Sequence, residues 1–155
     1  MKVILTGATG FIGGEVLEQC LSHPSIAEIL VITRRALPKP AASDPKVKIV
    51  ILKDFTSYPP TILEQLSRAD ACIWTPGQAG GDAAQAKLVN MDFTMAGANA
   101  IAASVASASK NWRGKKFHFV YVSGKFTERN QEANLWLMSD FRRMRVWLVS
   151  CGFHE

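Results

Sequence analysis

Three glycines near the start of the chain constrain its fold more than any other feature. Gly7, Gly10 and Gly13 are spaced G-x-x-G-x-x-G, directly after the apolar run that begins at Lys2 and before residues 11–22, whose apolar positions recur at helical intervals. This order predicts a strand, a tight turn and a helix. Backbone N–H groups and the helix dipole at such a turn favour an anion, so the turn fits a pyrophosphate. The alternative is a structural glycine turn without a ligand.

The rest of the chain alternates between short apolar runs and helical patterns. Further strands are expected at residues 28–33, 46–52, 70–75 and 117–122, and further helices at residues 61–68, 82–109 and 131–150. Nearly continuous apolar strands between helices are typical of a parallel sheet covered on both faces. We therefore expect an α/β fold, a Rossmann-like doubly wound parallel sheet of about five strands in the order 3-2-1-4-5. A chain of 155 residues has room for one such domain, residues 1–155.

Composition and charge narrow the class of protein. Apolar residues make up 48% and charged residues 20% of the chain, which is typical of a globular protein. The net charge is +5, and the basic residues are scattered apart from two clusters, at residues 110–116 and 142–145. We interpret these clusters as a solvated loop and a solvated helix face, so no nucleic-acid partner is expected. The three cysteines share no metal-ligand spacing, and no apolar run approaches the roughly 20 residues of a membrane span. Since the first strand begins at Lys2, no targeting peptide is expected, and a cytoplasmic location follows.

The end of the second expected strand carries a signal for the cofactor. Arg34 and Arg35 follow this strand, and residues 32–37 contain no carboxylate. NAD sites place an acidic residue there for the ribose 2′-hydroxyl, whereas NADP sites use arginine for the 2′-phosphate. The pattern favours NADP over NAD, the alternative being a solvated arginine pair. Thr75, at the end of the fourth expected strand, should border the nicotinamide end of the cofactor. In a doubly wound sheet, ligands lie beyond the carboxyl ends of the strands, where the connections after neighbouring strands go to opposite faces of the sheet.

The glycine segment TGATGFIGG resembles that of the short-chain dehydrogenase/reductase superfamily, in particular its extended and atypical members, the NAD(P)-dependent epimerase/dehydratase-like proteins. The resemblance covers residues 2–124 and includes residues 89–101. It implies that the residues of the turn bind the cofactor, namely Gly7, Thr9, Gly10, Phe11, Ile12 and Gly13.

The resemblance also assigns roles at the ends of two later strands. Asp54 and Phe55 match an acidic and apolar pair that lies beside the adenine, although Asp54 could equally cap a turn. Ser123 falls where the superfamily keeps its catalytic serine or threonine, and the alternative is a serine that satisfies a turn.

The superfamily's catalytic tyrosine and lysine are not found in their expected place. They stand four positions apart on the helix after Ser123, where the lysine lowers the tyrosine pKa. Tyr121 and Lys125 have this spacing, but Tyr121 precedes the serine and belongs to an expected strand. Strand alternation would separate the two side chains, so we interpret the match as coincidental.

These expectations leave the function open between two classes. The first is an NADP-dependent oxidoreductase or epimerase-like enzyme acting on an unidentified small carbonyl or hydroxyl compound. The second is a non-catalytic NADP-sensing regulator like the NmrA-type proteins, and a truncated, inactive remnant is a further alternative. A complete extended member continues through more strands and a substrate subdomain, which residues 125–155 cannot supply. Residues 82–109 or the apolar helix at residues 131–150 could form a homodimer.

Overall fold

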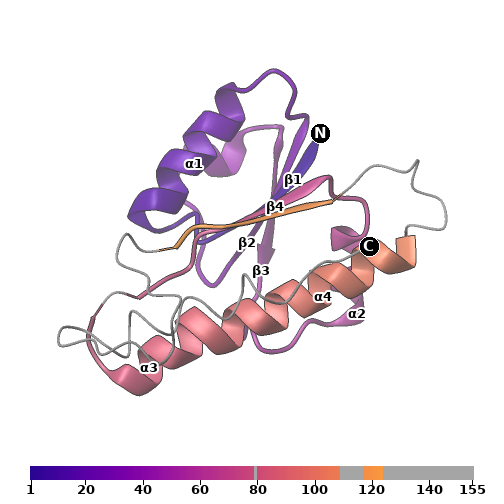
Figure 1. Cartoon of the computed structure of the whole chain (residues 1–155). Coiled ribbons are helices and arrows are strands. Elements are labelled where there is room, and N and C mark those ends of the chain that lie inside the picture. The colour runs from indigo at the N-terminus through magenta and orange to yellow at the C-terminus, as the bar shows by residue number, and fades with distance from the viewer. Residues whose placement is uncertain (79, 109–116, 124–155) are drawn as a thin grey trace.

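The sheet has the order that the sequence predicts. The structure is a computed structural model that describes residues 1–78, 80–108 and 117–123. Its five strands are all parallel and follow the order β3-β2-β1-β4-β5 (Figure 1). The strands are β1 (Lys2–Thr6), β2 (Glu28–Thr33), β3 (Val47–Ile51), β4 (Ala71–Trp74) and β5 (His118–Tyr121).

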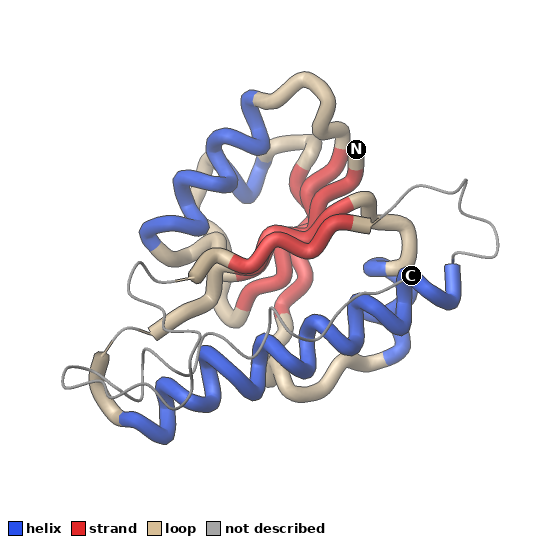
Figure 2. The backbone as a smooth tube through the Cα atoms, in the orientation of Figure 1, coloured by secondary structure: helices blue, strands red, loops and turns tan. Residues whose placement is uncertain are grey.

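Helices cover both faces of this sheet. One face carries α1 (Phe11–Ser22), and the other carries α2 (Pro60–Leu66) and α4 (Phe93–Ala108), as the tube in Figure 2 shows. The single helix expected at residues 82–109 is divided into α3 (Ala83–Lys87), a π-helical stretch η2 (Leu88–Asp92) and α4. The proline-rich segment between β2 and β3 contains only a short 3₁₀ turn, η1 (Ala41–Ser43). The helix expected at residues 131–150 lies outside the described residues.

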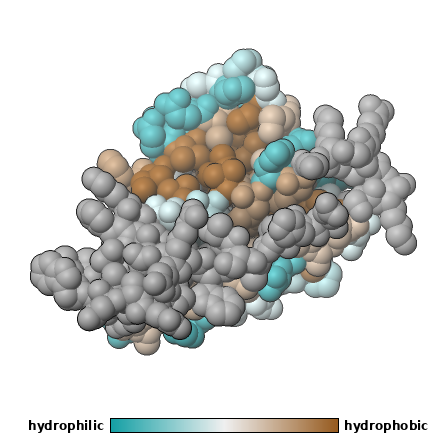
Figure 3. Space-filling model, in the orientation of Figure 1, coloured by the Kyte–Doolittle hydropathy of each residue, from teal (hydrophilic) through white to brown (hydrophobic). Residues whose placement is uncertain are grey.

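Two hydrophobic clusters follow directly from strand alternation. On β1, Ile4 faces the cluster beneath α2 and α4, while Leu5 faces the cluster beneath α1. Figure 3 shows hydrophilic residues on the outer surface near α1, with hydrophobic residues of the sheet beneath them. Among the described residues, no helix is long and apolar enough to cross a bilayer.

The pairing of β1 with β2 and β4 determines where a ligand site is expected. Thr6 pairs with Ile32 of β2 on one side and with Trp74 of β4 on the other. The chain leaves β1 toward α1 on one face and leaves β4 toward α3 and α4 on the other. The two connections diverge at this point, and in doubly wound sheets ligands bind in the resulting crevice at the carboxyl ends of the strands.

Candidate functional site

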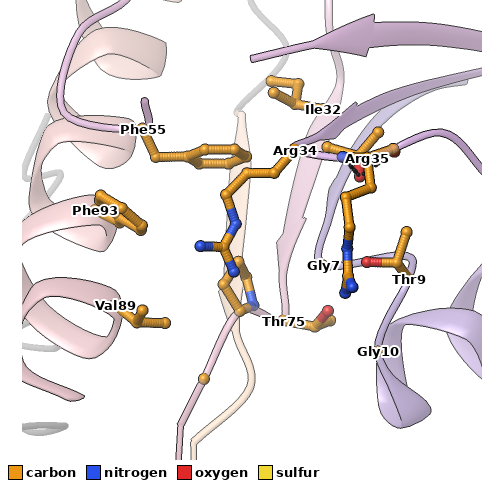
Figure 4. A pocket seen from close by; sticks show the side chains of 13 residues that line it. Gly7, Thr9, Gly10, Ile32, Arg34, Arg35, Phe55, Thr75, Val89 and Phe93 are labelled. Carbon is orange, nitrogen blue, oxygen red and sulfur yellow. Dashed lines mark hydrogen bonds between the residues drawn. The ribbon is translucent and has the colours of Figure 1, made fainter. Parts of the chain in front are cut away.

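A cavity of about 220 Å³ lies at the carboxyl ends of β1, β2 and β4 (Figure 4). Sites that enclose a drug-sized ligand have roughly 300–1,000 Å³, so a dinucleotide would lie partly outside this cavity. The structure brings together seven of the residues predicted from the sequence: Gly7, Thr9, Gly10, Arg34, Arg35, Phe55 and Thr75. The residues predicted at the site that do not line the cavity are Phe11, Ile12, Gly13, Asp54 and Ser123.

The three glycines of the turn have different physical roles. Gly7 has φ +76°, and a Cβ there would overlap the Thr75 hydroxyl and lie 2.9 Å from the backbone nitrogen of Pro76. At Gly13, a Cβ would overlap the carbonyl oxygen of Gly7, so this glycine lets α1 begin close to β1. A Cβ on Gly10 would meet only the Gly7 oxygen, at 3.3 Å, so its remaining surroundings are open. Of the three, Gly10 therefore leaves space for a ligand at the backbone.

Thr75 fixes the wall of the cavity opposite the arginines. Its hydroxyl donates a hydrogen bond of 2.7 Å to the carbonyl oxygen of Thr6, which ties the end of β4 to the end of β1. The next residues, Pro76 and Gly77, also line the cavity. The segment after β4 is thereby held against the glycine turn.

Both arginines at the end of β2 lie at the cavity. The Thr33 hydroxyl donates to the carbonyl oxygen of Arg35 at 2.8 Å and accepts from the Arg35 N–H at 3.3 Å, so a local turn holds their backbone. The Arg34 guanidinium carbon lies 5.9 Å from the centre of the Phe93 ring, while the Arg35 side chain extends toward Thr9 (Figure 4). In the described part of the chain neither arginine has an ion pair. No carboxylate is among the described residues that line the cavity.

Phe93 and Val89 form an apolar wall that sequence reasoning missed. Val89 belongs to η2 and Phe93 begins α4, and both line the cavity together with Phe55, whose ring centre lies 5.8 Å from that of Phe93. Phe55 in turn packs edge-on against Trp74, with 6.0 Å between ring centres. The sequence contains a signal, because apolar residues four apart in a helix share one face. Their spacing alone does not distinguish a cavity wall from the hydrophobic core.

Asp54 takes the turn-capping role instead of a place in the cavity. Its carboxylate accepts hydrogen bonds from the hydroxyl of Thr56 at 2.7 Å and from the Thr56 N–H at 2.8 Å. These two hydrogen bonds lower the pKa of Asp54. Phe11 and Ile12 belong to the first turn of α1 and are 98% and 52% exposed, so their side chains point to solvent.

The predicted catalytic position lies beyond the end of β5. Ser123 is exposed there and is not part of the cavity wall. Tyr121 packs against the hydrophobic cluster beneath α2 and α4. Lys125 lies outside the described residues, so the interpretation of Tyr121 and Lys125 as a coincidental match stays a prediction.

Solved structures with a similar fold include dehydrogenases, a reductase and epimerases. The chain resembles a short-chain dehydrogenase/reductase from Saccharomyces cerevisiae (TM-score 0.67, 14% identity, covering 95% of this chain and 61% of that one). It also resembles a nucleoside-diphosphate-sugar epimerase from Agrobacterium tumefaciens (TM-score 0.65, 18% identity, 94% and 45% covered). A third match is a mutated uronate dehydrogenase from Agrobacterium tumefaciens complexed with NAD (TM-score 0.56, 16% identity, 86% and 45% covered).

Two curated relatives are fungal proteins whose names refer to biosynthesis. The chain is 34% identical over 125 residues to the leucinostatins biosynthesis cluster protein T of Purpureocillium lilacinum, covering 79% of this chain and 42% of that protein. It is 44% identical over 66 residues to the hybrid PKS-NRPS synthetase mycA of Thermothelomyces thermophilus, covering 41% of this chain and 2% of that protein. The chain thus spans less than half the length of either relative. No protein-family model matches it.

The sheet order and the glycine turn define a Rossmann fold of the dinucleotide-binding type. More specifically, its fold matches about half of the chain of a short-chain dehydrogenase/reductase and of a nucleoside-diphosphate-sugar epimerase. The chain spans 61% of the length of that short-chain dehydrogenase/reductase and 45% of the length of that epimerase.

Proposed function

We propose that the protein binds NADP and is an oxidoreductase or epimerase-like enzyme of the atypical short-chain dehydrogenase type, acting on a small carbonyl or hydroxyl compound. One observation carries the cofactor assignment. Arg34 and Arg35 face the cavity from the end of β2, and no carboxylate is among its described lining residues. A ribose 2′-phosphate would find two guanidinium groups there, whereas a 2′-hydroxyl would find no acidic partner.

The cavity offers a place for each part of the adenosine half. The pyrophosphate would lie over Gly10 at the start of α1, where backbone N–H groups and the helix dipole attract an anion. The adenine would lie against the apolar wall that Phe55, Val89 and Phe93 form. The bound cofactor would supply or accept the hydride, and its nicotinamide end would extend past Thr75 toward the end of β5.

The catalytic part of the proposal rests on the family resemblance and on Ser123. This serine is exposed beyond the carboxyl end of β5, where its hydroxyl could hydrogen-bond a substrate oxygen. The group that moves the proton is unassigned. A role in the biosynthesis of a small molecule is supported by the similarity to a leucinostatins biosynthesis cluster protein and to a hybrid PKS-NRPS synthetase. A cytoplasmic location and a homodimer, through residues 82–109 or through the helix expected at residues 131–150, stay predictions.

A non-catalytic NADP-sensing protein of the NmrA-like type is the second candidate. One specific observation favours it, since Tyr121 packs against the hydrophobic cluster beneath α2 and α4 and neither described tyrosine lines the cavity. A sensor would bind the cofactor as well as an enzyme does but would not turn over a substrate. An inactive remnant would bind neither nucleotide.

Titration with NADPH and with NADH, followed by turnover on a panel of carbonyl compounds, tests the proposal. We expect tighter binding of NADPH, and Arg34→Ala and Arg35→Ala should each weaken NADPH about 10-fold to 100-fold, as loss of a charged hydrogen bond does. NADH binding should change less, because it has no 2′-phosphate. Arg68→Ala is the matched control, since Arg68 is exposed but lies away from the cavity. Equal affinity for the two nucleotides would refute the NADP assignment, and binding without turnover would favour the sensor.

A further inference from the structure

The side chain of Arg34 covers part of the apolar wall of the cavity. Its guanidinium carbon lies 5.9 Å from the centre of the Phe93 ring, which is within the range of a cation–π interaction. Figure 4 shows this side chain directed toward Phe93 and Val89, two of the residues that form the wall. The adenine of the proposed cofactor would lie against the same wall. The guanidinium and the adenine therefore compete for the Phe93 ring.

Arg35 has a different place in the cavity, although it is the next residue. Its side chain extends toward Thr9, on the side of the glycine turn (Figure 4). Within the part of the chain that the structure describes, the cation–π contact at the cavity involves Arg34 and not Arg35. The two guanidinium groups are therefore not equivalent, because only Arg34 would have to move before an adenine could reach Phe93.

The contact of Arg34 with Phe93 is weak enough to be exchanged for a better one. The Arg34 side chain is exposed, and it forms no ion pair with a described residue. At an exposed site, a cation–π interaction changes an equilibrium constant by only about 2-fold to 5-fold. A phosphate would offer the guanidinium charge-assisted hydrogen bonds, which are stronger. A ligand without a 2′-phosphate gives no such compensation for the lost ring contact.

We propose that Arg34 determines specificity by exclusion, because it occupies the adenine position at Phe93 until a 2′-phosphate draws it away. This inference rests on the proposed function and deepens it. An attraction to the 2′-phosphate favours NADP, and the contact with Phe93 adds a cost for nucleotides that lack this phosphate. For such nucleotides the binding-competent form of the site is only partly populated, which weakens their apparent affinity.

The test compares adenosine with adenosine 2′-monophosphate, which differ only in the 2′-phosphate. NMR titration of Arg34→Ala should show adenosine bound about 2-fold to 5-fold more tightly than by the wild-type protein, because the Phe93 ring is free. The same variant should bind the monophosphate about tenfold more weakly. Adenosine carries no charge, so loss of a cation by itself does not alter its binding. Arg35→Ala is the matched comparison, since it removes a guanidinium from the same cavity and should weaken only the monophosphate.

The outcomes separate this inference from the proposed function. If the wild-type protein binds the monophosphate and Arg34→Ala binds adenosine equally or more weakly, the exclusion is refuted and the NADP assignment stands. If the wild-type protein binds neither ligand, the proposed function and this inference both fail.

A second measurement decides if only the monophosphate binds tightly enough to titrate. In the NMR spectrum of the free wild-type protein, the Phe93 ring should shift the side-chain signals of Arg34 upfield. Addition of the monophosphate should remove this shift, because the guanidinium leaves the ring. Arg34 signals without a ring-current shift, or with a shift that persists at saturation, would refute the exclusion.

Discussion

Gly13 and Gly14 are adjacent glycines in α1 for which the structure predicts opposite effects of alanine. At Gly13, an added Cβ would overlap the carbonyl oxygen of Gly7 and lie 2.5 Å from its carbonyl carbon. These are backbone atoms of a turn that the Gly10 N–H holds through a 2.9 Å hydrogen bond to Gly7. At Gly14, the nearest atom to an added Cβ is the Ala8 oxygen, at an ordinary contact distance of 3.7 Å.

The magnitude follows from two opposing contributions. Overpacking against atoms that cannot rotate away costs about 3 kcal/mol, the upper part of the usual range, while alanine in place of helical glycine contributes about 1 kcal/mol. Gly13→Ala should therefore reduce the free energy of unfolding by about 2 kcal/mol, and Gly14→Ala should increase it by about 1 kcal/mol. For a chain of this length, about 2–4 °C accompanies each kcal/mol, so Tm should fall by about 4–8 °C and rise by about 2–4 °C respectively.

Thermal unfolding followed by circular dichroism measures both variants against the wild-type protein. NADPH titration of Gly13→Ala should also show weaker binding, because α1 must move away from the turn to relieve the overlap. A Gly13→Ala variant as stable as the wild type would refute the close packing of α1 on the turn. A shift in the same direction for both variants would refute the distinction between the two glycines.

Three further predictions concern the packing and ionisation of described residues. Gly97→Ala should lower the free energy of unfolding by about 1–3 kcal/mol, because the added Cβ would overlap the buried Trp74 ring. Urea unfolding measures this change, and unchanged stability would contradict the packing of Gly97 against Trp74. Because hydrogen bonds from Thr56 lower the pKa of Asp54, the stability they add is present above about pH 4 and is lost on further acidification. Unfolding of Asp54→Asn between about pH 3 and pH 6 should lack this part of the pH dependence. Burial raises the pKa of Cys72, so mass-spectrometric mapping should find its thiol unlabelled by a thiol reagent until the protein unfolds.

Much of the fold could be read from local patterns. The strand at Glu28–Thr33 is a nearly continuous apolar run, and the turn after β1 needs a positive φ at Gly7, which glycine tolerates. The π-helical stretch Leu88–Asp92 could not be predicted, because helical periodicity alone does not show an inserted residue. In the structure, the buried Asn90 of this stretch forms hydrogen bonds with Gln78, in the segment after β4. These bonds require a particular direction of the Asn90 side chain, which depends on tertiary packing.

By itself the sequence determined that a glycine turn follows the first strand and that two arginines follow the second. Both features are local, since backbone freedom and charge belong to the residues themselves. Only the tertiary structure decided which of them share a cavity, because parallel pairing brings the ends of β1, β2 and β4 to one edge of the sheet. It also assigned Phe93 to the cavity and Asp54 to a turn, since the direction of a side chain depends on neighbours far away along the chain.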